Sequence, residues 1–267
     1  MICDLHTHSQ YSFDGTASIQ TLCAAATEHG VGILAITDHC DMIDGPECIA
    51  AYLAAEESRS LEFFSLREQC RPLELLWGVE IGNAIDRPQE TADFLRERSF
   101  DFVIGAIHFL PDGSDIYKLP YPDAAAVDTM FRSYFDSMRQ LVELGGFDTL
   151  AHLDYPLRVL SQKVEKPTIA QYRDLVDPIL AGLVKRSIAL EINTRGTYDW
   201  QNRVGPEEWV LRRYRELGGE LVTIGRDAHV SRYVGAGYQQ AAELLQKTGF
   251  SAYTIYRNRS PVQIALP

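Results

Sequence analysis

The chain has few of the residues and segments that mark membrane proteins or disulfide-stabilised proteins. Only five of its 267 residues are cysteine, and no two of them form a CxxC pair. We therefore predict reduced thiols, without a disulfide framework or a thiolate zinc site. No apolar run approaches the roughly 18 residues that a membrane-spanning helix requires. The first residues also lack the features of a signal peptide, so we expect a cytoplasmic protein with no membrane partner.

Positive charge is also scarce. The 25 Lys and Arg residues face 37 Asp and Glu residues, which gives a formal net charge of −12. A chain this acidic repels a phosphate backbone, so we expect no long nucleic acid as a partner. The same charge would repel a small anionic substrate unless local charges reverse the field. The glycine-rich patterns GxGxxG and GxxxxGK[ST] are absent, which disfavours the nucleotide-binding folds that use them.

Short apolar runs alternate with longer amphipathic segments along the whole chain. The strand candidates are residues 2–6, 33–37, 73–81, 102–107, 147–153, 188–193, 221–225 and 253–256. The helix candidates are residues 18–29, 48–70, 89–98, 123–144, 169–186, 206–217 and 233–246. Apolar strands separated by helices are typical of parallel βα units, which close into a barrel or form an open doubly wound sheet. No linker-like segment interrupts the pattern, so we predict a single domain over residues 1–267.

Most of the histidines share one position in this pattern. Six of the seven fall at the carboxyl ends of strand candidates, namely His6, His8, His39, His108, His152 and His229. The third strand candidate carries Glu80 at a similar position, and the sixth carries Glu191 and Asn193. A single strand-end histidine is more often a hydrogen-bonded structural residue. In a parallel barrel, however, the carboxyl ends of all strands meet at one mouth, where active sites lie.

The spacing of these residues predicts metal binding. Residues i and i+2 of a strand face the same way, so His6 with His8, and Asp227 with His229, form two-residue clamps. Neutral imidazole and carboxylate groups are ligands of zinc, iron and manganese. These groups are too numerous for one tetrahedral ion. We therefore predict a multinuclear metal site at the barrel mouth.

The order of the motifs resembles the PHP (polymerase and histidinol phosphatase) family. The motifs are HxH at 6–8, Ser-Phe-Asp-Gly at 12–15, Thr-Asp-His at 37–39, the strand-end residues Glu80, His108 and His152, and DxH at 227–229. The resemblance extends from Cys3 to about His229. It implies an α/β fold, a distorted (β/α)7 TIM-like barrel, and a centre of three divalent ions (Zn, Fe or Mn).

The resemblance also implies a ligand set when it is carried over residue by residue. His6, His8, Glu80 and Asp227 would surround one ion. Glu80 would bridge to a second ion, held by His108 and His152. Asp14, His39 and His229 would hold the third. Among these ligands, Glu80, Asp227 and His229 are the residues to which we assign catalysis.

Two arginines lie just beyond strand candidates. Arg158 follows the fifth and Arg195 follows the sixth. A solvated surface position is the commoner fate of an arginine, but its planar guanidinium suits bidentate contact with phosphate. In the histidinol-phosphatase branch, arginines at matching places bind the substrate phosphate, so the resemblance implies that role here. We further expect Glu191 and Asn193 to line the pocket, near a substrate ammonium.

We predict that residues beside the ligands orient the imidazoles. Asp38 and Asp154 are the candidate acceptors, although Asp38 could instead point into the barrel wall. The hydroxyls of Ser9 and Ser12 are interpreted as hydrogen-bonding groups rather than nucleophiles.

Two metal ions about 3.5–4 Å apart can activate a water and position both oxygens of a phosphoester displacement. The leading hypothesis is therefore a metal-dependent phosphomonoesterase, and the resemblance points to L-histidinol phosphate and histidine biosynthesis. One alternative is a PHP-type phosphodiesterase or exonuclease on nucleotides or short oligonucleotides. Another is a non-catalytic, metal-binding regulatory protein. We expect a small phosphomonoester as the partner, and the pattern leaves the oligomeric state and the identity of each metal open.

Overall fold

A computed structural model describes residues 1–44, 48–160, 167–199 and 202–267. Its main sheet contains β1 (Ile2–Asp4), β2 (Val31–Ile36), β3 (Glu74–Gly82), β4 (Phe102–Ala106), β5 (Thr149–Leu150), β6 (Ala189–Asn193) and β7 (Val222–Gly225). The strands lie in chain order, and each neighbouring pair is parallel.

The first and last of these strands also meet. The amide of Leu5 donates to the carbonyl of Ile224 at 3.0 Å, and a parallel bridge joins Thr7 to Ala228. The sheet therefore curls into a nearly closed barrel. This confirms the predicted distorted (β/α)7 TIM-like barrel and excludes an open doubly wound sheet.

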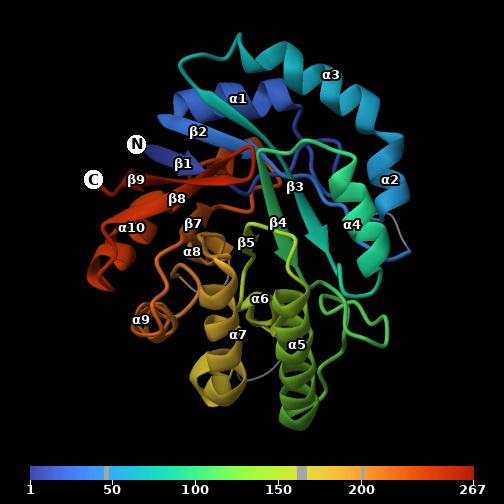
Figure 1. The fold of residues 1–267 in the computed structure, drawn as a ribbon, viewed down its shortest axis with the longest axis vertical. Helices are drawn as coiled ribbons and strands as arrows, with labels where there is room; N and C mark the ends of the chain where they lie inside the picture. The colour runs from blue at the N-terminus through green and yellow to red at the C-terminus, as the bar shows by residue number, and fades with distance from the viewer. Residues whose placement is uncertain (45–47, 161–166, 200–201) are drawn as a thin grey trace.

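Helices surround the barrel (Figure 1). They are α1 (Ile19–Glu28), α2 (Ile49–Ala54), α3 (Glu56–Arg67), α4 (Pro88–Arg96), α5 (Ala124–Leu144), α6 (Tyr155–Val159), α7 (Arg173–Arg186), α8 (Gly196–Asp199), α9 (Glu208–Glu216) and α10 (Tyr238–Lys247), with 3₁₀ turns at Ile169–Tyr172 and Ser231–Tyr233. Local sequence explains several boundaries. The side chains of Ser18 and Asp123 accept hydrogen bonds from the first turns of α1 and α5. Among the described residues, no helix has the length and apolarity needed to cross a membrane.

Apart from shifted boundaries, two expected elements differ from the structure. The single helix predicted over 48–70 is divided into α2 and α3 at Ala55. Across this break, the guanidinium of Arg59 in α3 lies 3.4 Å from the centre of the Tyr52 ring in α2. The predicted strand at 253–256 is β8 (Ala252–Arg257), and it pairs antiparallel with β9 (Ser260–Ala265), which was not predicted. Asn258 and Arg259 have positive φ angles of 48° and 62°, as a tight hairpin turn requires.

The β8–β9 hairpin lies at the amino ends of the barrel strands. Its contacts join Tyr253 to Met1, Arg257 to Glu74, Asn258 to Asp101 and Arg259 to Asp148. These partners precede or begin strands β1, β3, β4 and β5. Figure 1 accordingly shows the red hairpin beside the dark blue first strand. The carboxyl ends of the strands are left open at the other side of the barrel.

Candidate metal centre

All nine predicted ligands lie on the carboxyl side of the barrel. They follow or end strands β1, β2, β3, β4, β5 and β7, in the order His6, His8, Asp14, His39, Glu80, His108, His152, Asp227 and His229. Parallel strands direct their carboxyl ends to one mouth, which is why positions far apart in the sequence meet here. All of these side chains except Asp14 are largely buried.

The Glu80 carboxylate lies at the middle of the cluster. Its Oε2 atom is 3.3 Å from Nε2 of His6, 3.6 Å from Nε2 of His8 and 2.9 Å from Nδ1 of His39. One oxygen of a single carboxylate thus faces imidazoles from two different strands.

The other oxygen of Glu80 faces a second pair of imidazoles. Its Oε1 atom is 3.1 Å from Nε2 of His152 and 3.4 Å from Nε2 of His108. Burial alone would raise the pKa of Glu80, but nearby positive charge at His6, His39 and His108 holds that pKa well below its usual range. Glu80 is therefore an anionic bridge between two groups of histidines.

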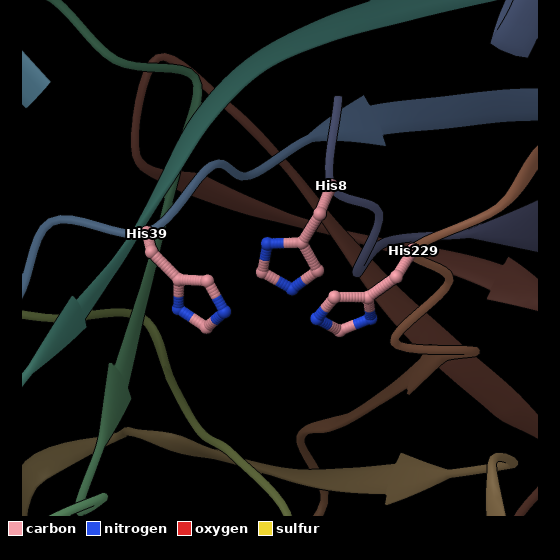
Figure 2. A group of neighbouring side chains, drawn as sticks. All are labelled: His8, His39 and His229. Atoms are coloured by element: carbon pink, nitrogen blue, oxygen red, sulfur yellow. The ribbon is translucent and has the colours of Figure 1, made fainter. Parts of the chain in front are cut away.

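A third group lies at the edge of the cluster. Figure 2 shows His8, His39 and His229 converging from the ends of three strands. The ring centre of His8 is 4.2 Å from that of His39 and 4.3 Å from that of His229. Asp14 approaches the same group, with its Oδ2 atom 2.8 Å from Nε2 of His229 and its Oδ1 atom 3.7 Å from Nε2 of His39.

The cluster has the properties of a cation site. Nε2 of His6, Nε2 of His8 and Nδ1 of His39 are buried and make no hydrogen bond with the described parts of the chain. Burial, together with the charges of His39 and His229, lowers the pKa of His8 well below its usual value, so its nitrogen lone pair is available. The described residues contain five groups of three potential ligands, and within each group the ligand atoms lie within 4.8 Å of one another. Neutral imidazoles and carboxylates in this arrangement fit divalent metal ions.

Glu191 holds the imidazole of His6 from behind. Its Oε1 atom lies 2.7 Å from Nδ1 of His6, and its Oε2 atom accepts from the amide of His152 at 2.7 Å and from Nδ2 of Asn193 at 3.1 Å. Glu191 is almost fully buried, and its carboxylate is engaged on both oxygens. Neither Glu191 nor Asn193 lines the cavity described below, so the expectation that they line the pocket near a substrate ammonium is wrong.

Asp41 has the corresponding place behind His108, and sequence reasoning missed it. Its Oδ2 atom lies 2.8 Å from Nδ1 of His108, which directs Nε2 of that ring toward Glu80. A Cβ atom at Gly82 would lie 2.0 Å from Oδ1 of Asp41, so glycine is required there to leave room for the carboxylate. Asp41 stands two residues after His39, and this i, i+2 spacing was the available signal.

Ser12 and Asp38 hold His8. The hydroxyl of Ser12 donates to Oδ1 of Asp38 at 3.0 Å, and its oxygen lies 3.2 Å from Nδ1 of His8. Asp38 also accepts from the amide and hydroxyl of Ser9. Asp38 therefore points toward the loop after β1, where it supports His8 through Ser12, and not into the barrel wall.

Seven of the nine predicted ligands, all except His6 and His8, line a cavity of about 330 Å³. Arg158 and Arg195 line its wall, and both contact Asp227. Nη2 of Arg158 is 2.6 Å from Oδ2 of Asp227, and Nη1 of Arg195 is 3.3 Å from Oδ1. Although burial would raise the pKa of Asp227, the two arginines help to keep that pKa well below its usual range. The aromatic residues Phe13, Phe109, Tyr117 and Tyr155 complete much of the wall.

Comparison with known proteins gives consistent matches. The model of the PHP domain family matches residues 4–195. A probable histidinol-phosphatase from Thermotoga maritima is 33% identical over 247 residues, which cover 92% of each chain. The histidinol-phosphatase of Lactococcus lactis is 25% identical over 257 residues, covering 92% of this chain and 91% of that protein.

Solved structures share the fold. The histidinol phosphate phosphatase of Lactococcus lactis, complexed with zinc, L-histidinol and phosphate, superposes with a TM-score of 0.77 at 23% identity over 98% of both chains. A histidinol phosphatase described as putative, from Listeria monocytogenes, superposes with a TM-score of 0.72 at 19% identity, covering 89% of this chain and 98% of that one.

Proposed function

Because this chain belongs to the PHP domain family, we propose that it is a metal-dependent phosphomonoesterase that hydrolyses L-histidinol phosphate to L-histidinol and phosphate. The observation that carries the proposal is a buried cluster of imidazoles and carboxylates below a small cavity with two arginines in its wall. The substrate is inferred from the histidinol-phosphatase names of relatives that match over nine-tenths of the chain. The reaction would serve histidine biosynthesis in the cytoplasm, with residues 1–267 as one domain.

The proposed centre holds three divalent ions of zinc, iron or manganese. The first would have His6, His8, Glu80 and Asp227 as ligands. Glu80 would be shared with the second, which His108 and His152 would also hold. Asp14, His39 and His229 would hold the third, and the placement of Asp14 between His39 and His229 supports that assignment. When bound, such ions supply a hydroxide nucleophile at neutral pH and stabilise the charge of the leaving oxygen.

The remaining residues have binding and positioning roles in this proposal. Arg158 and Arg195 bind the substrate phosphate, since both guanidinium groups line the cavity wall. Glu191 and Asp41 accept the Nδ1 protons of His6 and His108, which leaves the Nε2 lone pairs directed into the cluster. The buried surroundings exclude bulk water from these contacts.

The cavity and the charge of the chain favour this function over the alternatives. A space of about 330 Å³ fits a small ester. The net charge of −12 repels long polyanions, which disfavours an exonuclease. Competent ligand types occupy all nine positions, which disfavours a purely regulatory role.

Steady-state hydrolysis with added zinc, iron or manganese tests the proposal. We expect kcat/KM for L-histidinol phosphate to exceed that for p-nitrophenyl phosphate by about a hundredfold or more. Its ammonium group and its imidazole can each add one polar contact, and two contacts of about 1.4 kcal/mol each give that ratio. His8→Ala and Glu80→Ala should lose bound metal, measured by elemental analysis, together with activity. Equal rates on the two esters would contradict the substrate assignment and leave the reaction class intact.

A further inference from the structure

A short hairpin after β4 carries one more charged residue to the cavity. Phe109 and Asp115 form an antiparallel bridge. The amide of Leu110 donates to the carbonyl of Ser114 at 2.9 Å, and the amide of Ile116 donates to the carbonyl of His108 at 3.2 Å. The hairpin therefore begins at a residue of the candidate metal centre. Its return strand places Asp115 beside that centre.

The side chains of the return strand alternate in direction. Ile116 is fully buried in the core, whereas its neighbours Asp115 and Tyr117 line the cavity. Oδ1 of Asp115 accepts from the amide of Tyr117 at 2.8 Å, and Oδ2 lies 2.8 Å from Nζ of Lys118. The Lys118 side chain is 79% exposed, so this ion pair is solvated and contributes little stability. A ligand cation can therefore share or take over the second oxygen.

The other carboxylates near the described cavity are already committed. Asp14, Glu80 and Asp227 belong to the proposed ligand set, and Asp41 is buried against His108. Asp115 is thus the lining carboxylate that combines solvent access with no place in that set.

The cavity wall also has groups for both charges of an ester that carries a phosphate and an ammonium group. Arg158 and Arg195 provide positive charge for a phosphate, while Asp115 provides negative charge from a separate loop. The rings of Phe13, Phe109 and Tyr117 lie on the same lining and offer apolar and cation-attracting faces. In L-histidinol phosphate the carbon next to the phosphate-bearing CH2 group carries an ammonium, and the imidazole is attached one carbon further along.

We propose that Asp115 binds the ammonium group of the substrate and thereby selects phosphate esters of small amino alcohols. This inference rests on the proposed function and assigns to Asp115 the role that the sequence pattern suggested for Glu191. Asp115 acts here as a specificity-determining residue, because it would contact the ammonium group and not the phosphoester bond.

The test compares two esters that differ only in the ammonium group. These are L-histidinol phosphate and its deaminated counterpart, 3-(imidazol-4-yl)propyl phosphate. Asp115→Asn removes the charge, and its amide oxygen can still accept from the amide of Tyr117, so the hairpin is preserved. The matched control is Asp112→Asn, in the turn of the same hairpin, where Asp112 accepts from the amide of Ser114 and does not line the cavity.

We expect Asp115→Asn to lower kcat/KM for L-histidinol phosphate about tenfold to a hundredfold more than for the deaminated ester, as loss of a charged hydrogen bond predicts. Inhibition by L-histidinol should weaken in parallel, whereas Asp112→Asn should not separate the two esters. If Asp115→Asn lowers both values equally in an enzyme that prefers L-histidinol phosphate over aryl phosphate, this inference alone is wrong. If the unmodified enzyme lacks that preference, the proposed function fails and this inference fails with it.

Discussion

Asp227 is the residue at which the candidate metal centre and the candidate phosphate site meet. Its Oδ1 atom lies 3.5 Å from Nε2 of His8, and the guanidinium groups of Arg158 and Arg195 contact its two oxygens. A single carboxylate therefore fixes the distance between the imidazole cluster and both arginines. A phosphate held by the arginines would lie next to the cluster.

This arrangement predicts the effect of removing one arginine. Arg195→Ala should lower kcat/KM for the phosphate ester about tenfold to a hundredfold, because a charged hydrogen bond contributes about 1.5–3 kcal/mol. The metal content should stay unchanged, since Arg195 lies outside the proposed ligand set. Steady-state kinetics and elemental analysis measure the two quantities. Arg232→Ala, at an exposed position away from the cavity lining, is the control, and a kinetically silent Arg195→Ala would refute the phosphate role.

Sequence reasoning located the proposed ligands but not all of the groups that hold them. A strand-end position predicts where His6 or His108 lies, because all parallel strands end at one mouth. It does not predict which ring nitrogen faces inward, since that depends on acceptors from other strands. Glu191 reaches His6 only because a Cβ atom is missing at Gly225, where it would lie 2.6 Å from Oε1 of Glu191. Such clearances arise from packing and have no periodic signature in the sequence.

At the scale of elements, the seven barrel strands were predictable because each is apolar and bounded by helices. The β8–β9 hairpin was only half predicted. In β9, half-buried residues such as Val262 and Ile264 alternate with exposed ones, so its apolar signal is weak. The division between α2 and α3 also lacked a signal, because Ala55 is a good helix former and neither Gly nor Pro marks the break.

The hairpin predicts a stability effect that is separate from the metal centre. Nε of Arg259 lies 2.5 Å from Oδ2 of Asp148, a largely buried carboxylate that also accepts from the amide of Val103. Arg259→Ala should lower the free energy of unfolding by about 1–3 kcal/mol, because it leaves a buried acceptor poorly compensated. For a chain of this size, that corresponds to a fall in Tm of roughly 2–4 °C per kcal/mol. Thermal unfolding followed by circular dichroism measures the change.

The pH dependence of this effect has a definite sign. Burial raises the pKa of Asp148 above its usual value, and Arg259 opposes that rise. Without Arg259 the pKa of Asp148 in the folded state rises further. The loss in the free energy of unfolding is therefore largest at neutral pH, where Asp148 is charged, and becomes smaller as the pH falls through that pKa. The deficit of Arg259→Ala should therefore shrink on acidification. Arg257→Ala, which breaks the more exposed pair with Glu74, is the control, and equal deficits at every pH in both variants would contradict the argument.

At the scale of the whole molecule, the net charge of −12 does not describe the field at the cavity. Glu80, Asp14 and Asp227 contribute −3 to the proposed centre, and three divalent ions would contribute +6, which leaves +3 before the arginines are counted. The acidic surface then acts against long polyanions, while the local charge attracts a small phosphate. Without the ions, these three carboxylates would be balanced only by the arginines that contact Asp227 and by the histidines around Glu80.

Metal removal should therefore lower the stability of the whole barrel without unfolding it. Ions that bind only the folded chain stabilise it by about 2.7 kcal/mol at a free concentration a hundred times Kd. At roughly 2–4 °C per kcal/mol, a chelator should lower Tm by roughly 5–10 °C for each tightly bound ion. The far-ultraviolet circular dichroism should persist at room temperature, because the apolar core and the β8–β9 hairpin do not depend on the centre. Glu80→Ala should show a much smaller chelator effect, since it removes the carboxylate shared by two proposed ions. An identical Tm with and without metal in the unmodified protein would mean that the buried imidazoles do not hold ions in the folded state.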